Sequence, residues 1–168
     1  SEAELGKIYI AELPLQASPN AMAEALANIT LDDDENRRLW CADAKAAYDA
    51  SFTIAPQLGS LDMGAVLAHI RTVLPPDAII TNGAGNFAIW PNKFIKYNTD
   101  MRLLAPQSGA MGYGLPAALA AKACDPDRFV LCFAGDGDFQ MNCAELGTAM
   151  QAGLYPIVLI VNNASYGT

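Results

Sequence analysis

The chain has 168 residues, of which 52% are hydrophobic, and carries a net charge of −8. Such acidity argues against a nucleic-acid-binding protein, because no basic stripe is available to meet a phosphate backbone. No apolar run reaches the ~18 residues expected of a membrane span, and the start lacks the features of a signal peptide, so we expect a cytoplasmic protein with one sizeable core.

The first third of the chain predicts one strand and two helices. Residues 7–13 predict a short strand. Ser18 and Pro19 are a typical N-cap and first helical residue, for a helix that ends near residue 29. The acids at 32–35 open a second helix, to about residue 50, because negative charge in a first turn favours the helix dipole. Residues 51–60 predict a connector.

From residue 62 onward, helical and strand patterns alternate regularly. This alternation predicts an α/β fold with a doubly wound, mainly parallel sheet and helices on both faces. The expected elements are helix 62–74, strand 78–81, a short helix to 90, strand 102–105, helix 115–123, strand 129–133, helix 142–153 and strand 157–161. The first 50 residues do not close a core of their own, and the chain stops directly after a strand, so we interpret it as a piece of a longer polypeptide.

Cysteine and histidine usage argues against zinc chemistry. The four cysteines form no C-x-x-C pair, and we interpret them as buried free thiols. The single histidine, His69, is far in sequence from any cysteine, which gives a zinc site no support.

Glycine- or amide-rich turns follow four of the predicted strands: Asn82–Asn86, Ser108–Gly112, Gly135–Phe139 and Asn162–Ser165. Parallel strands end at one edge of a sheet, where open α/β sheets bind ligands. Asp136 and Asn163 offer hard oxygen donors there, which suit Mg²⁺ shared with a phosphate group. Since residues 129–168 contain no Lys or Arg, a metal and backbone N–H groups at helix starts would have to neutralise a diphosphate.

Three other interpretations compete for these motifs. Residues 83–88 fit G-x-G-x-x-A, a dinucleotide fingerprint, but residues 101–107 hold no acid for a ribose. The D-x-D of Asp136 and Asp138 is also typical of an aspartyl phosphotransferase, although Gln140 stands where Ser or Thr is expected. Glu145 could serve as an acid or base, but Asn142 three residues earlier predicts a capping box, in which Glu145 bonds back to the Asn142 amide.

Two motifs together carry a resemblance to a known family. Gly135-Asp136-Gly137, the following helix and Asn162-Asn163 resemble the thiamine diphosphate motif of the acetolactate synthase and 2-oxo acid decarboxylase superfamily. Residues 108–118 resemble its second hallmark. The resemblance covers about residues 60–168. It implies that residues 1–50 are the end of a central domain plus linker, and that 51–168 are a thiamine-diphosphate-binding domain truncated at its C-terminus.

The resemblance also implies a set of site residues. Asp136 and Asn163 would ligate Mg²⁺ by their side chains and Ser165 by its carbonyl, with diphosphate oxygens and a water completing an octahedron. Met111 would lie under the cofactor and force the cofactor into a bent conformation. In that conformation the amino group of the cofactor's pyrimidine ring lies against the reacting carbon of its thiazolium ring. The cofactor-binding residues so implied are Asn86, Gly109, Met111, Gly135, Asp136, Gly137, Asp138, Phe139 and Asn163, with the amides of Asp138 and Phe139 on the diphosphate.

The implied activity is decarboxylation or carboligation of 2-oxo acids, by a lyase or transferase. The family's activating glutamate belongs to a pyrimidine-binding domain of the parent chain, from a second subunit of a homo-oligomer. This chain would therefore supply no catalytic residue and be inactive alone. Asn86-Phe87 stands where many synthases have Gln-His, so that histidine is absent. A non-catalytic cofactor-binding paralogue and a Rossmann-type nucleotide-binding oxidoreductase domain remain as alternatives.

Overall fold

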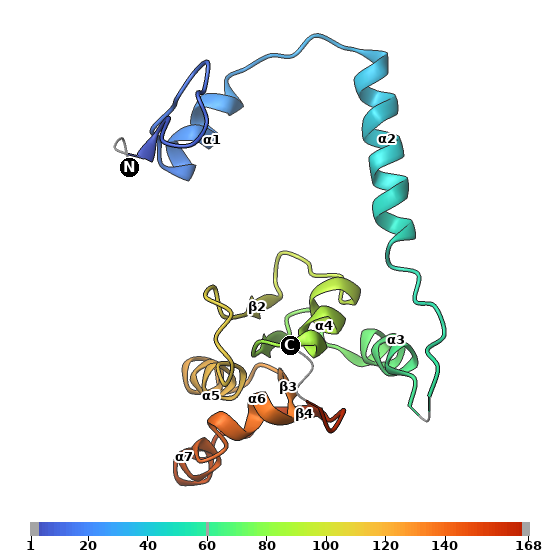
Figure 1. The fold of residues 1–168 in the computed structure, drawn as a ribbon, viewed down its shortest axis with the longest axis vertical. Helices are drawn as coiled ribbons and strands as arrows, with labels where there is room; N and C mark the ends of the chain where they lie inside the picture. The colour runs from blue at the N-terminus through green and yellow to red at the C-terminus, as the bar shows by residue number, and fades with distance from the viewer. Residues whose placement is uncertain (1–3, 60, 166–168) are drawn as a thin grey trace. The chain divides into compact units, whose positions relative to one another are not determined.

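The computed structural model describes residues 4–59 and 61–165 (Figure 1). The chain divides into two compact units, Ser1–Ala46 and Ala47–Thr168. The assignment of residues 1–50 to the end of a central domain stays a prediction. Within the described ranges, no helix has both the length and the apolar character needed to cross a bilayer.

Two α-helices lie in the described part of the first 50 residues. In α1 (Pro19–Ala27), the Ser18 hydroxyl accepts a hydrogen bond from the Ala21 N–H at 3.2 Å, as the N-cap prediction requires. Helix α2 (Glu35–Ala50) is exposed along its whole length. The strand predicted for residues 7–13 is wrong: this segment is irregular and exposed. A strand requires a partner for its backbone hydrogen bonds, and the described part of this unit provides none.

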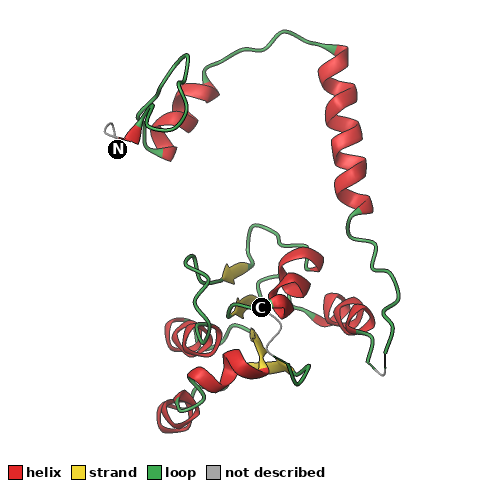
Figure 2. Cartoon of the chain, viewed as in Figure 1, coloured by secondary structure: helices red, strands yellow, loops and turns green. Residues whose placement is uncertain are grey.

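The second unit is built on a four-stranded sheet, shown in yellow in Figure 2. The strand order is β2-β1-β3-β4 and every pair is parallel. The strands are β1 (Ile79–Asn82), β2 (Arg102–Leu104), β3 (Val130–Gly135) and β4 (Ile157–Val161). Chain order differs from spatial order, since β1 lies between β2 and β3. The sheet and its connections confirm the predicted doubly wound α/β fold.

Helices cover both faces of this sheet because successive strand residues point to opposite sides. On one face, Ile80, Leu131 and Phe133 form a core with residues of α3 (Met63–Val73) and α4 (Ile89–Phe94). On the other face, Val130 and Cys132 pack against α5 (Gly114–Cys124). Helix α7 (Glu145–Ala152) packs on α5 in turn. Cys132 is the one buried cysteine, so the prediction of buried thiols is wrong for the other three.

The helix predicted for residues 142–153 forms over the shorter range of α7, whose last residue, Ala152, is followed by the C-cap Gly153 with φ of 66°, in the left-handed region that glycine tolerates. A separate short helix that was not predicted, α6 (Asp136–Met141), begins directly at the end of β3, where the sequence predicts a turn. The predicted capping box does not form. Residue Ala144 precedes α7 without a side-chain cap, while the Asn142 amide donates to the Gly112 carbonyl at 2.8 Å. The Asn142 side chain therefore bonds to a residue 30 positions away and does not cap the helix that follows it.

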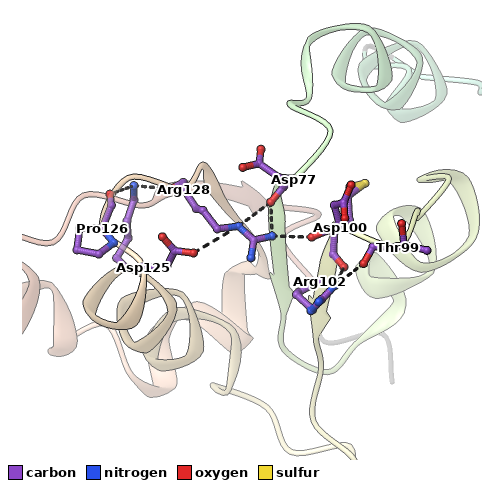
Figure 3. Close-up of polar contacts among 9 residues, drawn as sticks. Asp77, Thr99, Asp100, Arg102, Asp125, Pro126 and Arg128 are labelled. Carbon is purple, nitrogen blue, oxygen red and sulfur yellow. Dashed lines mark hydrogen bonds and ion pairs between the residues drawn. The ribbon is translucent and has the colours of Figure 1, made fainter.

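The amino-terminal edge of the sheet is held by Arg128, which precedes β3 (Figure 3). Its guanidinium donates to the carbonyl oxygen of Asp77 at 2.8 Å and to that of Asp100 at 2.8 Å. These two residues precede β1 and β2. A looser ion pair joins Arg128 to Asp125 at 3.7 Å. One side chain therefore ties together the starts of three strands.

Candidate functional site

A cavity of about 440 Å³ lies at the carboxyl-terminal edge of the sheet. Residues from all four strand-end turns line it: Ala84–Phe87 after β1, Met111 after β2, Gly135–Asp138 after β3, and Asn162, Asn163 and Ser165 after β4. Leu61, Met63 and Trp90 add an apolar wall. The parallel sheet thus brings together segments that are up to about 80 positions apart in sequence, as the general rule for open α/β sheets predicts.

Most residues implied by the family resemblance line this cavity. They are Asn86, Met111, Gly135, Asp136, Gly137, Asp138, Asn163 and Ser165. Gly109 and Phe139 are not among its described lining residues. Gly109 is exposed with φ of 68°, and the Phe139 ring packs against the core below α5. Their expected contacts, through main-chain atoms, stay predictions.

Asp136 and Asn163 follow neighbouring strands. Gly135 is paired in register with Val161, so both residues leave the sheet at the same level. The Asn163 carboxamide oxygen accepts from the Ser165 N–H at 3.0 Å, which folds the turn back on itself. This oxygen has a second lone pair. A carboxylate, a carboxamide and nearby backbone carbonyls are the hard oxygen donors that fit Mg²⁺.

Protein side chains alone do not complete a metal centre here. In the described ranges, no three His, Cys, Asp or Glu side chains gather in a metal-binding arrangement. An ion held by Asp136 and Asn163 would therefore need further oxygens from main chain, water and ligand. That requirement is met by a ligand rich in phosphate oxygens.

Asp138 is the buried charge of the site, with 3% of its surface exposed. Its Oδ1 accepts from the Gly112 N–H at 2.7 Å and from the Ala84 N–H at 3.2 Å. Burial raises the pKa of the Asp138 carboxyl group, and bonds from the backbone N–H groups of Gly112, Ala84 and Gly135 oppose that rise. The family resemblance implies a role for Asp138 through its backbone amide only. The side chain has a further role that the sequence does not indicate, because it joins the turns after three strands.

Close packing explains the glycines of the first turn. A Cβ atom on Gly83 would overlap the Asp138 carboxyl group, and one on Gly85 would lie 2.9 Å from the Phe87 ring. The ring of Phe87 also leaves no room for a Cβ on Gly135, at 2.8 Å. A carboxylate against Gly83 is poorly suited to a phosphate at that glycine. The geometry therefore disfavours the dinucleotide interpretation of residues 83–88.

Comparison with known families gives the site its chemical context. Residues 83–168 match the model of the family described as "Thiamine pyrophosphate enzyme, C-terminal TPP binding domain". The chain belongs to this family. All four turns that line the cavity fall within or directly border the matched residues. The resemblance found from the two sequence motifs is confirmed, and membership of a thiamine pyrophosphate enzyme family leaves the nucleotide-binding alternative without support.

Relatives of this thiamine pyrophosphate domain include acetolactate synthases. The chain is 31% identical to acetolactate synthase isozyme 1 large subunit of Escherichia coli and 30% identical to the large subunit of Lactococcus lactis, in each case over 98% of the chain. It spans 29% of the length of either relative. A solved structure, the thiamine diphosphate-dependent 4-hydroxybenzoylformate decarboxylase of Rhodococcus jostii, matches 69% of this chain and 22% of its own, with 32% identity and a TM-score of 0.60.

Proposed function

We propose that this chain forms the diphosphate-binding part of a thiamine diphosphate- and Mg²⁺-dependent enzyme that decarboxylates or ligates 2-oxo acids. The observation that carries the proposal is the cavity itself. It brings Asp136, Asn163 and Met111 together inside the residues that match a thiamine pyrophosphate-binding family. The substrate class follows the relatives, an acetolactate synthase and a decarboxylase of 4-hydroxybenzoylformate, which is itself a 2-oxo acid.

In this proposal, Asp136 and Asn163 hold Mg²⁺ through side-chain oxygens, and Ser165 contributes its carbonyl. The metal compensates the diphosphate charge, since residues 129–168 contain no Lys or Arg. Main-chain groups of Gly135–Phe139 and Asn86 contribute further diphosphate contacts. When bound, thiamine diphosphate supplies the electron sink that allows a 2-oxo acid to lose CO₂.

The chain's own part in the chemistry is to bind, orient and exclude water. Met111 is half-buried at the cavity wall and supports the cofactor from below. Phe87 and Trp90 give the cavity an apolar side, where a lower effective dielectric strengthens the charge interactions with the metal. We propose that the proton-transferring glutamate comes from a pyrimidine-binding domain of a second subunit, in a cytoplasmic homo-oligomer.

The test is calorimetric titration of the full-length protein with thiamine diphosphate, first with Mg²⁺ and then with EDTA. We expect binding that requires Mg²⁺. The variant Asp136→Ala should weaken it by at least about 10- to 100-fold, the loss that removal of even an outer-sphere partner causes at metal sites. Asp127→Ala is the matched control, because this carboxylate is exposed in the loop before β3, at the opposite edge of the sheet.

Each outcome decides a part of the proposal. Equal affinity in Mg²⁺ and in EDTA would refute the metal site of Asp136 and Asn163. An absence of binding by the full-length protein would refute the cofactor assignment. Cofactor binding without release of CO₂ from any 2-oxo acid would identify the non-catalytic paralogue instead.

A further inference from the structure

The turn that carries Met111 has no regular structure of its own. It lies between β2 and α5, and its backbone is left-handed at Gly109 and at Gly112, with φ of 68° and 82°. Such a turn is not stabilised by helix or sheet hydrogen bonds. Besides a local bond from the Gly109 N–H to the Pro106 carbonyl at 3.3 Å, its conformation depends on contacts from elsewhere in the fold.

Two side chains from the segment after β3 make those contacts. Asp138, in α6, accepts from the Gly112 N–H at 2.7 Å. Asn142, directly after α6, donates to the Gly112 carbonyl at 2.8 Å. Both main-chain groups of one residue are thus held from a single short segment, 26 and 30 positions away in sequence. We call Asp138 and Asn142 the Gly112 clamp.

The clamp acts directly next to Met111. The N–H from which Asp138 accepts a hydrogen bond belongs to the peptide group that joins Met111 to Gly112. The orientation of this peptide group sets the direction of the Met111 backbone. Gly112 is buried, and a Cβ atom there would lie 2.7 Å from the Asn142 amide nitrogen. The fit therefore leaves the turn little freedom. At its other end, the Thr81 hydroxyl donates to the Gly114 carbonyl at 2.8 Å.

Asp138 extends the same link to the first turn of the cavity. The oxygen that accepts from Gly112 also accepts from the Ala84 N–H at 3.2 Å. A shift of α6 would therefore move the turns after β1 and β2 together. Asp136 lies in the first turn of the same helix, so the proposed metal ligand and Asp138 of the clamp belong to one helix.

We infer that the Gly112 clamp positions Met111 against thiamine diphosphate, coupling the place of the cofactor's ring system to that of its diphosphate. Asp138 and Asn142 are positioning residues, because they act through the turn and touch no reacting atom. This inference rests on the proposed function. It assigns Asn142 to the positioning of Met111, whereas the capping-box interpretation assigned this residue to the start of a helix.

The test is a double-mutant cycle on the dissociation constant of thiamine diphosphate, measured in the full-length protein with Mg²⁺. Loss of one neutral hydrogen bond in Asn142→Ala should weaken binding about 3- to 10-fold. In a Met111→Ala background the same change should cost less than about twofold, because residues that act as a unit are not additive. A purely structural Asn142 would lower the unfolding midpoint in both backgrounds without this coupling.

Matched variants separate the clamp from general packing. Asn98→Ala is the control: the Asn98 amide also donates to a backbone carbonyl, that of Pro76 at 2.8 Å, but at the other edge of the sheet. We expect it to lower stability and leave cofactor affinity unchanged. Asn142→Asp keeps the side-chain size, places an acceptor opposite the Gly112 carbonyl, and should cost at least as much as alanine.

The outcomes are distinct from those of the function test. If the wild-type protein does not bind thiamine diphosphate, the function and the clamp both fail. If it binds, but Asn142→Ala weakens binding equally with and without Met111, the clamp alone is refuted. An unchanged affinity in both Asn142 variants would refute it as well.

Discussion

The two edges of the sheet are held by side chains of opposite charge. At the amino-terminal edge, the Arg128 guanidinium donates to carbonyl oxygens that precede two other strands. At the carboxyl-terminal edge, the Asp138 carboxylate accepts from N–H groups that follow two other strands. Strand starts thus present acceptors to a cation, and strand ends present donors to an anion.

Burial is what separates the two arrangements. The Arg128 side chain is 21% exposed and its acceptor residues lie at the surface, so water can replace the arginine. Asp138 is 3% exposed and its partner Gly112 is buried, so water is much less able to replace the carboxylate there. A charged side chain that bonds to main-chain groups of neighbouring strands therefore stabilises the fold at the amino-terminal edge. At the carboxyl-terminal edge, the same kind of contact also shapes the cavity.

The largest expected effect is that of Asp138→Leu. Leucine has a similar shape but accepts no hydrogen bond, which leaves the N–H groups of Gly112 and Ala84 unpaired. The buried Gly112 N–H alone should lower the free energy of unfolding by about 1–3 kcal/mol. The half-buried Ala84 N–H, which borders the cavity, adds a smaller loss. Urea denaturation monitored by circular dichroism would measure it, and cofactor affinity should fall with it.

Asp138→Asn is the control for this loss, because its carboxamide oxygen can still accept both bonds. If asparagine and leucine destabilise the protein equally, the lost hydrogen bonds are not the cause, and the contrast between the two edges disappears.

The sequence was sufficient to predict the sheet and the edge at which the cavity lies. Strands β1, β3 and β4 follow from short apolar runs that end in turn residues, and these signals are local. The helix ends at Ser18 and Gly153 were predictable for the same reason. Parallel pairing then brings Asp136 and Asn163 together without further information.

What the sequence could not supply were contacts between distant turns. The partners of Asp138 lie 26 and 54 positions away, and nothing near Asp138 in sequence indicates which way its carboxylate points. At Asn142 the local signal was misleading, since the capping pattern lost to a hydrogen bond from 30 positions away. The strand predicted at residues 7–13 failed because alternation says nothing about whether a partner strand exists.

A smaller effect is expected from Gly135→Ala, at the last residue of β3 and directly before Asp136. The new Cβ atom would lie 2.8 Å from the Phe87 ring, so the ring or the strand end must move. Overpacking of this kind costs about 1–3 kcal/mol. Because Asp136 is the next residue, we expect Mg²⁺-dependent cofactor binding to weaken as well, as measured by calorimetry.

Two companion variants test that explanation. Phe87→Leu in the Gly135→Ala background should restore part of the affinity by vacating the space. Gly147→Ala, inside α7 with open space around it, should be neutral or stabilise the protein by about 0.5–1 kcal/mol, as alanine does in helices. A loss at Gly147 as large as that at Gly135 would contradict the packing argument.

The smallest effect, and the sharpest contrast with Asp138, is expected for Arg128→Ala. Both carbonyl acceptors belong to exposed residues, so water can satisfy them once the guanidinium is gone, and the loss of unfolding free energy should be about 1 kcal/mol. Arg128→Lys keeps the charge but not the planar fork that reaches two carbonyls, and should fall between alanine and wild type. Cofactor affinity should be unchanged in both, because the amino-terminal edge of the sheet lies away from the cavity. A fall in affinity for Arg128→Ala that exceeds its fall in stability would mean that the two edges are coupled through the strands. The division into a structural edge and a site edge would then have to be given up.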